Sequence, residues 1–121
     1  MDATELTVGI LQDAFGSVPV STELPMGRQN APERLVVVTL MGGPDDGFLW
    51  EPVMGITCYG TTDRDAFGMA QYAAEALTEA AMDHPYMSAA ETESISRDEW
   101  TTTGQARYYA QVRLTINTDE E

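Results

Sequence analysis

The chain has 121 residues, with twenty acidic and six basic side chains and a formal net charge of −14. This length predicts one domain whose core is large enough to fold without disulfides or metal. The negative charge argues against a conventional DNA or RNA reader, because phosphate contacts need basic side chains. One cysteine (Cys58) and one histidine (His84) predict neither an internal disulfide nor a structural zinc site. No apolar leader or membrane-length run is present, which favours a cytosolic origin.

The first predicted element is a short amphipathic helix that begins after Asp2 and ends at Gly16. Asp2 and Glu5 have the spacing of a capping box, and glycine is a common residue just beyond a helix end. Apolar residues recur on one helical side at Leu6, Ile10, Leu11, Ala14 and Phe15. Alternation over residues 18–24 then predicts a strand, and a loop containing proline and glycine follows as far as Pro32.

A long β-hairpin is predicted over residues 34–59. Residues 35–40 are apolar at almost every position, which predicts a central strand covered on both faces and the most buried strand of the sheet. Turn-forming residues are dense at 42–47. Pro52 and Gly55 predict an edge, a bulge or a bend in the returning strand.

The hairpin tip carries the first candidate contact residues, which are Phe48, Leu49 and Trp50. Three large apolar side chains beside a turn should be shielded from water, either by folding back onto the domain or by docking into another subunit. Asp45 and Asp46 supply two carboxylates, too few for a calcium loop, so we interpret that segment as a plain turn.

The segment 56–63 leads from a strand into a long alanine-rich helix. It contains no phosphate-binding glycine cluster, no histidine and no nucleophile elbow, so it predicts architecture rather than chemistry. Thr62 is a suitable N-cap, the helix should run to about Met82, and the His84-Pro85 pair should end it. We interpret His84 as a helix cap rather than a metal ligand. Cys58 is interpreted as a small buried apolar residue rather than a nucleophile.

The apolar arc of this helix covers roughly half of its circumference. It consists of Phe67, Ala70, Ala74, Leu77 and Ala81, flanked by Ala66, Ala73, Ala80, Met69 and Ala76. So wide an arc predicts contact with a sheet and with a second surface, either the first helix or a neighbouring subunit, and the intramolecular contact is favoured. Met69 and Tyr72 are the candidate contact residues on this helix.

Two further strands should complete the sheet. Residues 88–100 are rich in glutamate and serine and predict a solvated edge strand, so Glu91 and Glu93 are interpreted as a solvated pair. After a turn at 101–105, residues 107–116 alternate between polar and apolar side chains and predict a half-buried strand. On it, Arg107 and Arg113 face one way and are candidates to bridge acidic neighbours across an interface. The acidic tail at 118–121 should be disordered.

The order of these elements resembles that of the tail terminator proteins of long-tailed bacteriophages, in the versions found in actinobacterial phages and prophages. The residues that carry the likeness are Ile56-Thr57-Cys58-Tyr59-Gly60-Thr61-Thr62, then Ala66, Ala70, Ala73, Ala74 and Leu77, and the closing Ala106-Arg107-Tyr108-Tyr109-Ala110-Gln111-Val112-Arg113-Leu114-Thr115-Ile116. The resemblance spans roughly residues 33–117.

The resemblance implies a single α+β domain over residues 1–121: a mixed, largely antiparallel sheet with a long β-hairpin, packed by one short N-terminal and one long central helix. It implies a homo-hexameric ring that caps the tail tube, stops tube polymerisation and provides the docking surface for the head connector. The partners would be the tail tube protein and the head-completion connector protein. DNA would be only passing cargo in an acidic lumen, and no membrane is involved. The subunit would assemble in the host cytoplasm and reside in the virion tail.

No catalytic residue, cofactor or metal is implied by this resemblance, so the chain is not expected to be an enzyme. The candidate interface residues rest on the physical interpretation of the sequence alone. One alternative is another head-to-tail joining or minor tail protein. A second is a small-ligand-binding or enzymatic α+β domain that uses Cys58 or the acidic cluster around Glu91.

Overall fold

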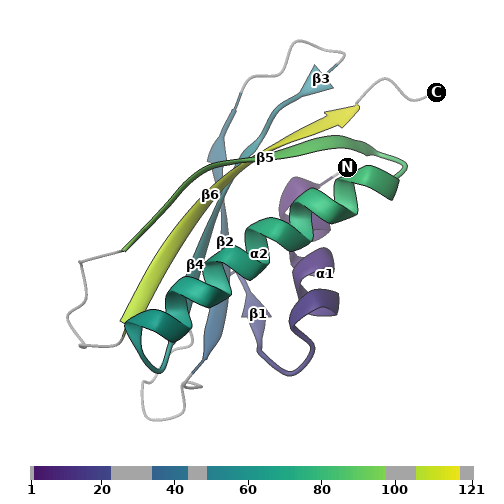
Figure 1. Ribbon diagram of the computed structural model, residues 1–121. Coiled ribbons are helices and arrows are strands. Elements are labelled where there is room, and N and C mark those ends of the chain that lie inside the picture. Colours follow the sequence, from purple (N-terminus) through teal and green to yellow (C-terminus); the bar gives the residue numbers. More distant parts are fainter. Residues whose placement is uncertain (1, 23–33, 44–48, 98–105, 118–121) are drawn as a thin grey trace.

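The computed structural model describes residues 2–22, 34–43, 49–97 and 106–117 of the chain (Figure 1). Several predictions fall outside the described residues. They concern the loop before Arg34, the turn at 44–47, Phe48, the end of the glutamate-rich strand, the turn at 101–105 and the acidic tail.

Within the described residues, two helices and one mixed sheet form the fold. The helices are α1 (Ala3–Phe15) and α2 (Asp63–Asp83), and the strands are β1 (Val20–Ser21), β2 (Leu35–Gly42), β3 (Leu49–Trp50), β4 (Val53–Gly60), β5 (Met87–Arg97) and β6 (Ala106–Asn117). Strand β1 is parallel to β2, and every other pairing is antiparallel. The predicted α+β class is confirmed, including the long β2–β4 hairpin and the short and long helices.

The strands lie side by side in the order β1, β2, β4, β6, β5. The short strand β3 also pairs with β6, at Ile116 and Asn117. Because β5 already occupies the other side of Ile116, β3 extends the ladder that β4 makes with β6. Strand β6 is therefore paired along both sides, and β5 is an edge strand as predicted.

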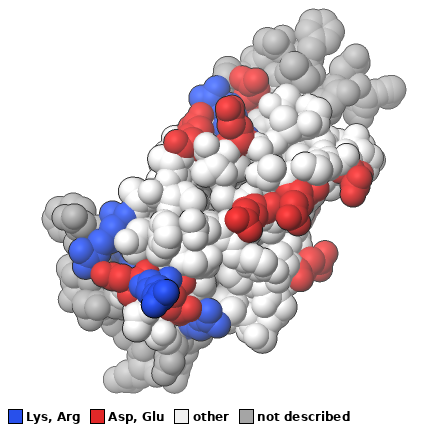
Figure 2. All heavy atoms as spheres, viewed as in Figure 1, with Lys and Arg blue, Asp and Glu red and all other residues white. Residues whose placement is uncertain are grey.

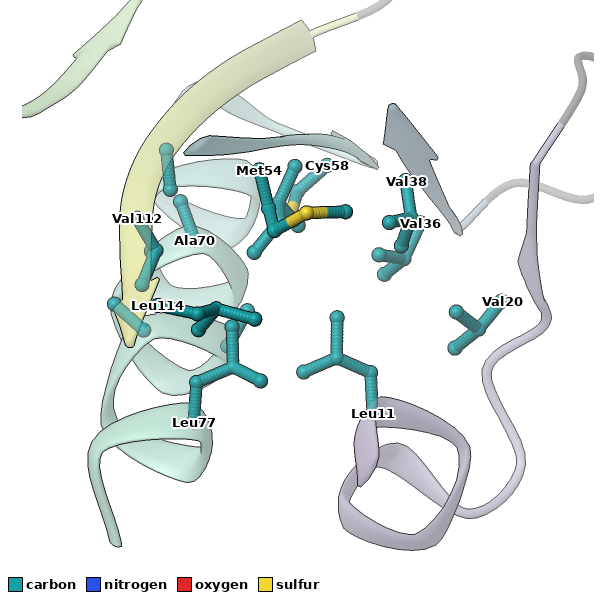
Figure 3. Packing of buried hydrophobic residues seen from close by; sticks show 14 of the residues in the cluster. Leu11, Val20, Val36, Val38, Met54, Cys58, Ala70, Leu77, Val112 and Leu114 are labelled. Atoms are coloured by element: carbon teal, nitrogen blue, oxygen red, sulfur yellow. The ribbon is translucent and has the colours of Figure 1, made fainter. Parts of the chain in front are cut away.

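Both helices lie against the same face of the sheet (Figure 1). Helix α2 crosses β4, β5 and β6, whereas α1 packs on β1, β2 and α2. Figure 3 shows Leu11 and Leu77 pointing from the helices toward the strands. The buried strand residues that meet them include Val36, Val38, Met54, Cys58, Val112 and Leu114. The core is thus one layer between helices and sheet.

The predicted N-terminal helix is confirmed together with both of its caps. The Asp2 carboxylate accepts hydrogen bonds from the backbone N–H groups of Thr4 at 2.9 Å and Glu5 at 3.3 Å. At the other end Gly16 adopts a φ of 67°, a conformation that glycine tolerates at a helix terminus.

The prediction that β2 is the most buried strand is wrong. Residues 35–38 are buried, but Thr39 to Gly42 are exposed. Strand β4 is more continuously buried, because it lies between β2 and β6 and under α2. The apolar run in β2 therefore extends beyond the area that the helices cover.

The predicted irregularity near Pro52 and Gly55 lies on the opposite strand. Strand β4 pairs without a break, and the register shift falls in β2, between Leu40 and Gly42. Gly55 is instead a point of close approach, since a Cβ there would lie 2.7 Å from the Tyr109 hydroxyl oxygen. The glycine thus leaves room for a side chain from β6.

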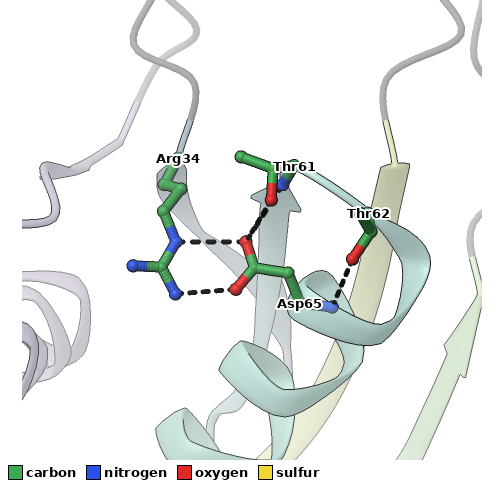
Figure 4. Close-up of polar contacts among 4 residues, drawn as sticks. All are labelled: Arg34, Thr61, Thr62 and Asp65. Atoms are coloured by element: carbon green, nitrogen blue, oxygen red, sulfur yellow. Dashed lines mark hydrogen bonds and ion pairs between the residues drawn. The ribbon is translucent and has the colours of Figure 1, made fainter.

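The turn from β4 into α2 is held by contacts around Asp65 (Figure 4). Its carboxylate accepts hydrogen bonds from the Arg34 guanidinium at 2.7 and 3.1 Å and from the Thr61 backbone N–H at 3.0 Å. The Thr62 hydroxyl accepts from the Asp65 N–H at 3.0 Å, which confirms Thr62 as N-cap. A Cβ on Gly60 would lie 2.6 Å from the Ala66 nitrogen, so glycine is required where the helix meets the strand.

The second surface that α2 contacts is α1, which confirms the favoured intramolecular contact. The Tyr72 hydroxyl donates a hydrogen bond to the Ala14 carbonyl at 2.7 Å, and its ring meets Phe15 edge-on at 5.1 Å. Phe67, predicted within the apolar arc, is exposed at its margin beside Tyr108. In the described part of the chain, neither helix combines the length and apolar character needed to cross a bilayer.

Replacing Asp65 by Asn should lower the free energy of unfolding by about 1 kcal/mol near neutral pH, because the Arg34 ion pair and the charge-assisted bonds are lost. The Arg34 hydrogen bond is the first cause that lowers the pKa of Asp65 below its ordinary 3.8. Folding therefore favours the charged carboxylate. Its contribution to stability is complete above the pKa that Asp65 has in the unfolded chain, and it is lost as the pH falls through the pKa that Asp65 has in the folded protein. Urea titrations at several pH values should show that the difference in unfolding free energy between wild type and variant shrinks as the pH falls below 3.8.

Asp63→Asn is the matched control, since Asp63 begins the same helix and its ion pair with Arg97 is longer, at 3.3 Å, and more exposed. It should cost less than about 0.5 kcal/mol. An equal cost for the two variants would mean that the Asp65 contacts do not stabilise the turn.

Candidate assembly interface

The face of the sheet opposite the helices carries mainly polar and aromatic side chains on β4 and β6, and apolar ones, Leu35 and Val37, on β2. Along β6, Ala110, Val112, Leu114 and Ile116 are buried, whereas Arg107, Tyr109, Gln111, Arg113 and Thr115 between them are half-buried. Neither described helix packs on these alternate positions. We call this surface the open face and define it as Thr57 and Tyr59 of β4, Arg107, Tyr109, Gln111 and Arg113 of β6, and Glu93 of β5.

Tyr59 and Arg107 form the first contact of the open face. They are directly opposed on β4 and β6. The Arg107 Nη1 donates a hydrogen bond to the Tyr59 hydroxyl at 3.2 Å, and its guanidinium carbon lies 5.6 Å from the centre of the Tyr59 ring. A guanidinium at this distance from an aromatic ring is attracted to the ring's electrons. The pair therefore holds the arginine along the sheet.

Glu93 connects the other polar residues of the open face. It is the extra residue where the β5–β6 register shifts between Thr92 and Ser94. One carboxylate oxygen accepts from the Gln111 amide at 2.8 Å, and the other lies 2.7 Å from the Arg113 Nη2. The bulge thus supplies an acceptor that reaches two β6 side chains.

Tyr109 of β6 joins the contacts made by Glu93, Gln111 and Arg113, and it lies next to β4. Its ring lies over Gly55, and its hydroxyl donates a long hydrogen bond of 3.4 Å to the Gln111 amide oxygen. Partial burial raises the pKa of the Tyr109 hydroxyl, so the side chain stays neutral and available as a donor. Four side chains from two strands are therefore held in one connected arrangement.

The charge of the open face differs from that of the whole chain. Its two arginines are balanced by Glu93 and by Glu91, which lies directly opposite Arg113 on β5, so this face is close to neutral, whereas the chain carries −14. Tyrosine and arginine are the residue types that protein interfaces favour. The open face therefore has the composition of a contact surface.

The structure divides the predicted contact residues between different places. Arg107 and Arg113 are brought together on the open face, as their spacing predicted. Within the single chain Arg113 pairs with Glu93, and the bridge to a neighbouring subunit stays a prediction. Phe48 and the side chain of Leu49 are outside the part of the chain that the structure describes.

Trp50 and Met69 belong to the helix side of the sheet. Trp50 is half-buried and packs against the core, which supports the alternative that the hairpin tip folds back onto the domain. Met69 is 3 % exposed, so its prediction as a contact residue is wrong: it is a core side chain under α2. Tyr72 is 47 % exposed and joins α2 to α1, away from the open face.

Cys58 is buried as predicted, and burial raises the pKa of its thiol to about 12. A thiol with so high a pKa is not a nucleophile near neutral pH. The His84 Nδ1 accepts a hydrogen bond from the Tyr86 backbone N–H at 3.1 Å, so it closes the turn after α2. Within the described ranges, no three His, Cys, Asp or Glu side chains are placed to hold a metal ion.

The sequence interpretation missed Tyr59, Tyr109, Gln111 and Glu93 as members of one surface. The strict alternation of β6 was the available signal, because it places Tyr109 and Gln111 on the same face as the two arginines. The contacts of Glu93 depend on a bulge that the local sequence does not predict.

The Glu93–Arg113 pair should be energetically coupled, because its side chains are only 26 % and 40 % exposed and Gln111 fixes the carboxylate. A double-mutant cycle with Glu93→Gln and Arg113→Met should give a coupling energy of about 0.5 to 1 kcal/mol in urea unfolding. The Asp63–Arg97 pair, with side chains 51 % and 57 % exposed, should give a value near zero. Equal coupling in both pairs would contradict an ordered open face.

Comparison with known proteins gives no family assignment. No protein-family model matches the chain, and the curated proteins contain no match either.

Proposed function

We propose that the chain is a phage tail terminator: a non-enzymatic structural subunit that forms a homo-hexameric ring on the tail tube, stops tube polymerisation and provides the surface for the head connector. The observation that carries this proposal is the open face, an ordered polar and aromatic surface that neither described helix covers. The resemblance of the strand-to-helix segment and of the closing strand to phage tail terminators supports the same function.

A ring requires a heterologous contact, in which one surface of a subunit meets a different surface of the next one. The open face is suited to such a contact because its side chains are already held by one another. Tyr59 fixes Arg107, and Glu93 fixes Gln111 and Arg113. Pre-ordered side chains lose little conformational entropy when a partner covers them.

The charge of the chain suits a ring through which DNA passes. At −14, a subunit surface repels phosphate at long range. Six copies would surround a passage that does not retain the nucleic acid. The terminator proposal thus accounts for an acidic protein that works beside DNA without binding it.

Another head-to-tail joining or minor tail protein remains the nearest alternative, since it would use the same kind of contact. Tail length separates them, because loss of a terminator should give overlong tubes and loss of a joining protein should not. A ligand-binding or enzymatic domain that depends on Cys58 has less support, because that thiol is buried and has a raised pKa.

The purified protein should form a species of six times 13.2 kDa, or about 79 kDa, in light scattering coupled to size-exclusion chromatography, with rings in negative stain. Arg107→Glu combined with Arg113→Glu should weaken assembly about tenfold or more, because two negative charges replace the arginines at the contact. Arg64→Glu is the control, since Arg64 lies on α2 at the other face of the sheet.

Circular dichroism should establish that all three proteins fold. Rings formed equally well by the double variant would contradict the open face as the contact. Normal tail lengths in phage that lack the gene would contradict the terminator function itself.

A further inference from the structure

A groove runs between α1 and α2 on the side of the molecule opposite the open face. It encloses about 480 Å³ and is lined by Ile10, Asp13, Ala14, Tyr72, Glu75, Ala76, Glu79 and Ala80. Its apolar floor comes from small side chains of both helices. Its acidic side chains are Asp13 on α1 and Glu75 and Glu79 on α2. We call it the acidic groove.

No basic side chain balances these carboxylates on either helix. Helix α1 has no arginine or lysine, and Arg64, in the first turn of α2, is the one basic residue of the two helices. Figure 2 shows this separation: acidic side chains form a row over α2, and basic ones gather near its beginning. Among the residues of the two helices, the acidic groove is therefore lined by negative charge alone.

The carboxylates on α2 are placed where they weaken the helix. Glu75, Glu79 and Asp83 follow one another at four-residue spacing, so like charges are neighbours on the helix surface. Asp83 also ends the helix, where the helix dipole disfavours negative charge, and no basic residue stands in the last turn. The stability of the helix does not explain them.

We propose that the acidic groove is the docking site for a basic amphipathic helix of a partner protein. Small apolar side chains of that helix would pack on Ile10 and Ala76, and its lysines or arginines would pair with Glu75 and Glu79. Charge complementarity selects this occupant over nucleic acid. It also disfavours the open face of a second copy, whose arginines are engaged by Tyr59 and Glu93.

The test uses the full chain and a synthetic helical peptide of about four turns, with lysines on one face and leucine and alanine on the other. Titration calorimetry should detect binding that weakens with salt, and a matched peptide with glutamate for lysine should not bind. Glu75→Gln combined with Glu79→Gln should reduce the affinity about tenfold, because two charged contacts are lost.

Two further variants separate docking in the groove from attraction to net charge. Glu51→Gln with Glu91→Gln removes the same charge away from the groove and should change affinity less than about twofold. Ala80→Phe fills the groove and should abolish binding while circular dichroism stays unchanged. Equal losses for the two charge variants, or full binding by a folded Ala80→Phe protein, would overturn the proposal. These results do not depend on whether the chain forms rings.

Discussion

The close contact between α2 and the sheet is the constraint on which the rest of the structure depends. Gly60 has no side chain at the point where the backbone of Ala66 approaches, and the buried side of α2 is built largely from alanine. Small residues let the helix lie directly on β4 and β6. Asp65 then joins the helix start to Arg34 at the beginning of β2, so helix, hairpin and sheet are fixed relative to one another.

This packing gives the two faces of the sheet different roles. One face is covered by α1 and α2 and contains the core. The other is covered by neither described helix. On β4 and β6 it carries mainly tyrosine, arginine, glutamine and threonine, and on β2 it carries the buried Leu35 and Val37. Such a face is stable in water because its polar groups bond to one another across strands, while the flat parts of the aromatic rings cover the backbone. The open face is thus a consequence of a fold with one layer of helices.

Local signals were sufficient to predict both helices and the last strand. Asp2, Gly16 and Thr62 act through contacts within a few residues of themselves, so sequence spacing locates them. The alternation of β6 likewise predicted which of its side chains are buried. These elements were sufficient to predict the α+β class.

The failed predictions all depend on contacts between segments that are distant in sequence. The burial of β2 stops halfway because the helices do not extend over its end, which its own apolar run does not reveal. The need for glycine at position 55 is explained by Tyr109, which is more than fifty residues away in sequence. Glu93 reaches Arg113 of β6 because β5 has a bulge at Glu93. Met69 was predicted as a contact residue because it flanks the apolar arc. Helical periodicity gives the direction of a side chain, but it does not show how wide the surface is that covers the helix.

The open face and the acidic groove lie on opposite sides of one sheet, so a subunit can use both surfaces at once. Their chemistry is also different: the open face is close to neutral and Arg113 is paired with Glu93, whereas no basic side chain of either groove helix balances the carboxylates of the groove, apart from Arg64 at the start of α2. A protein that joins copies of itself and also binds another component needs two surfaces that do not compete, because a shared surface would make the two contacts exclusive. The separation of these surfaces by the buried layer would let both of the proposed contacts form at once.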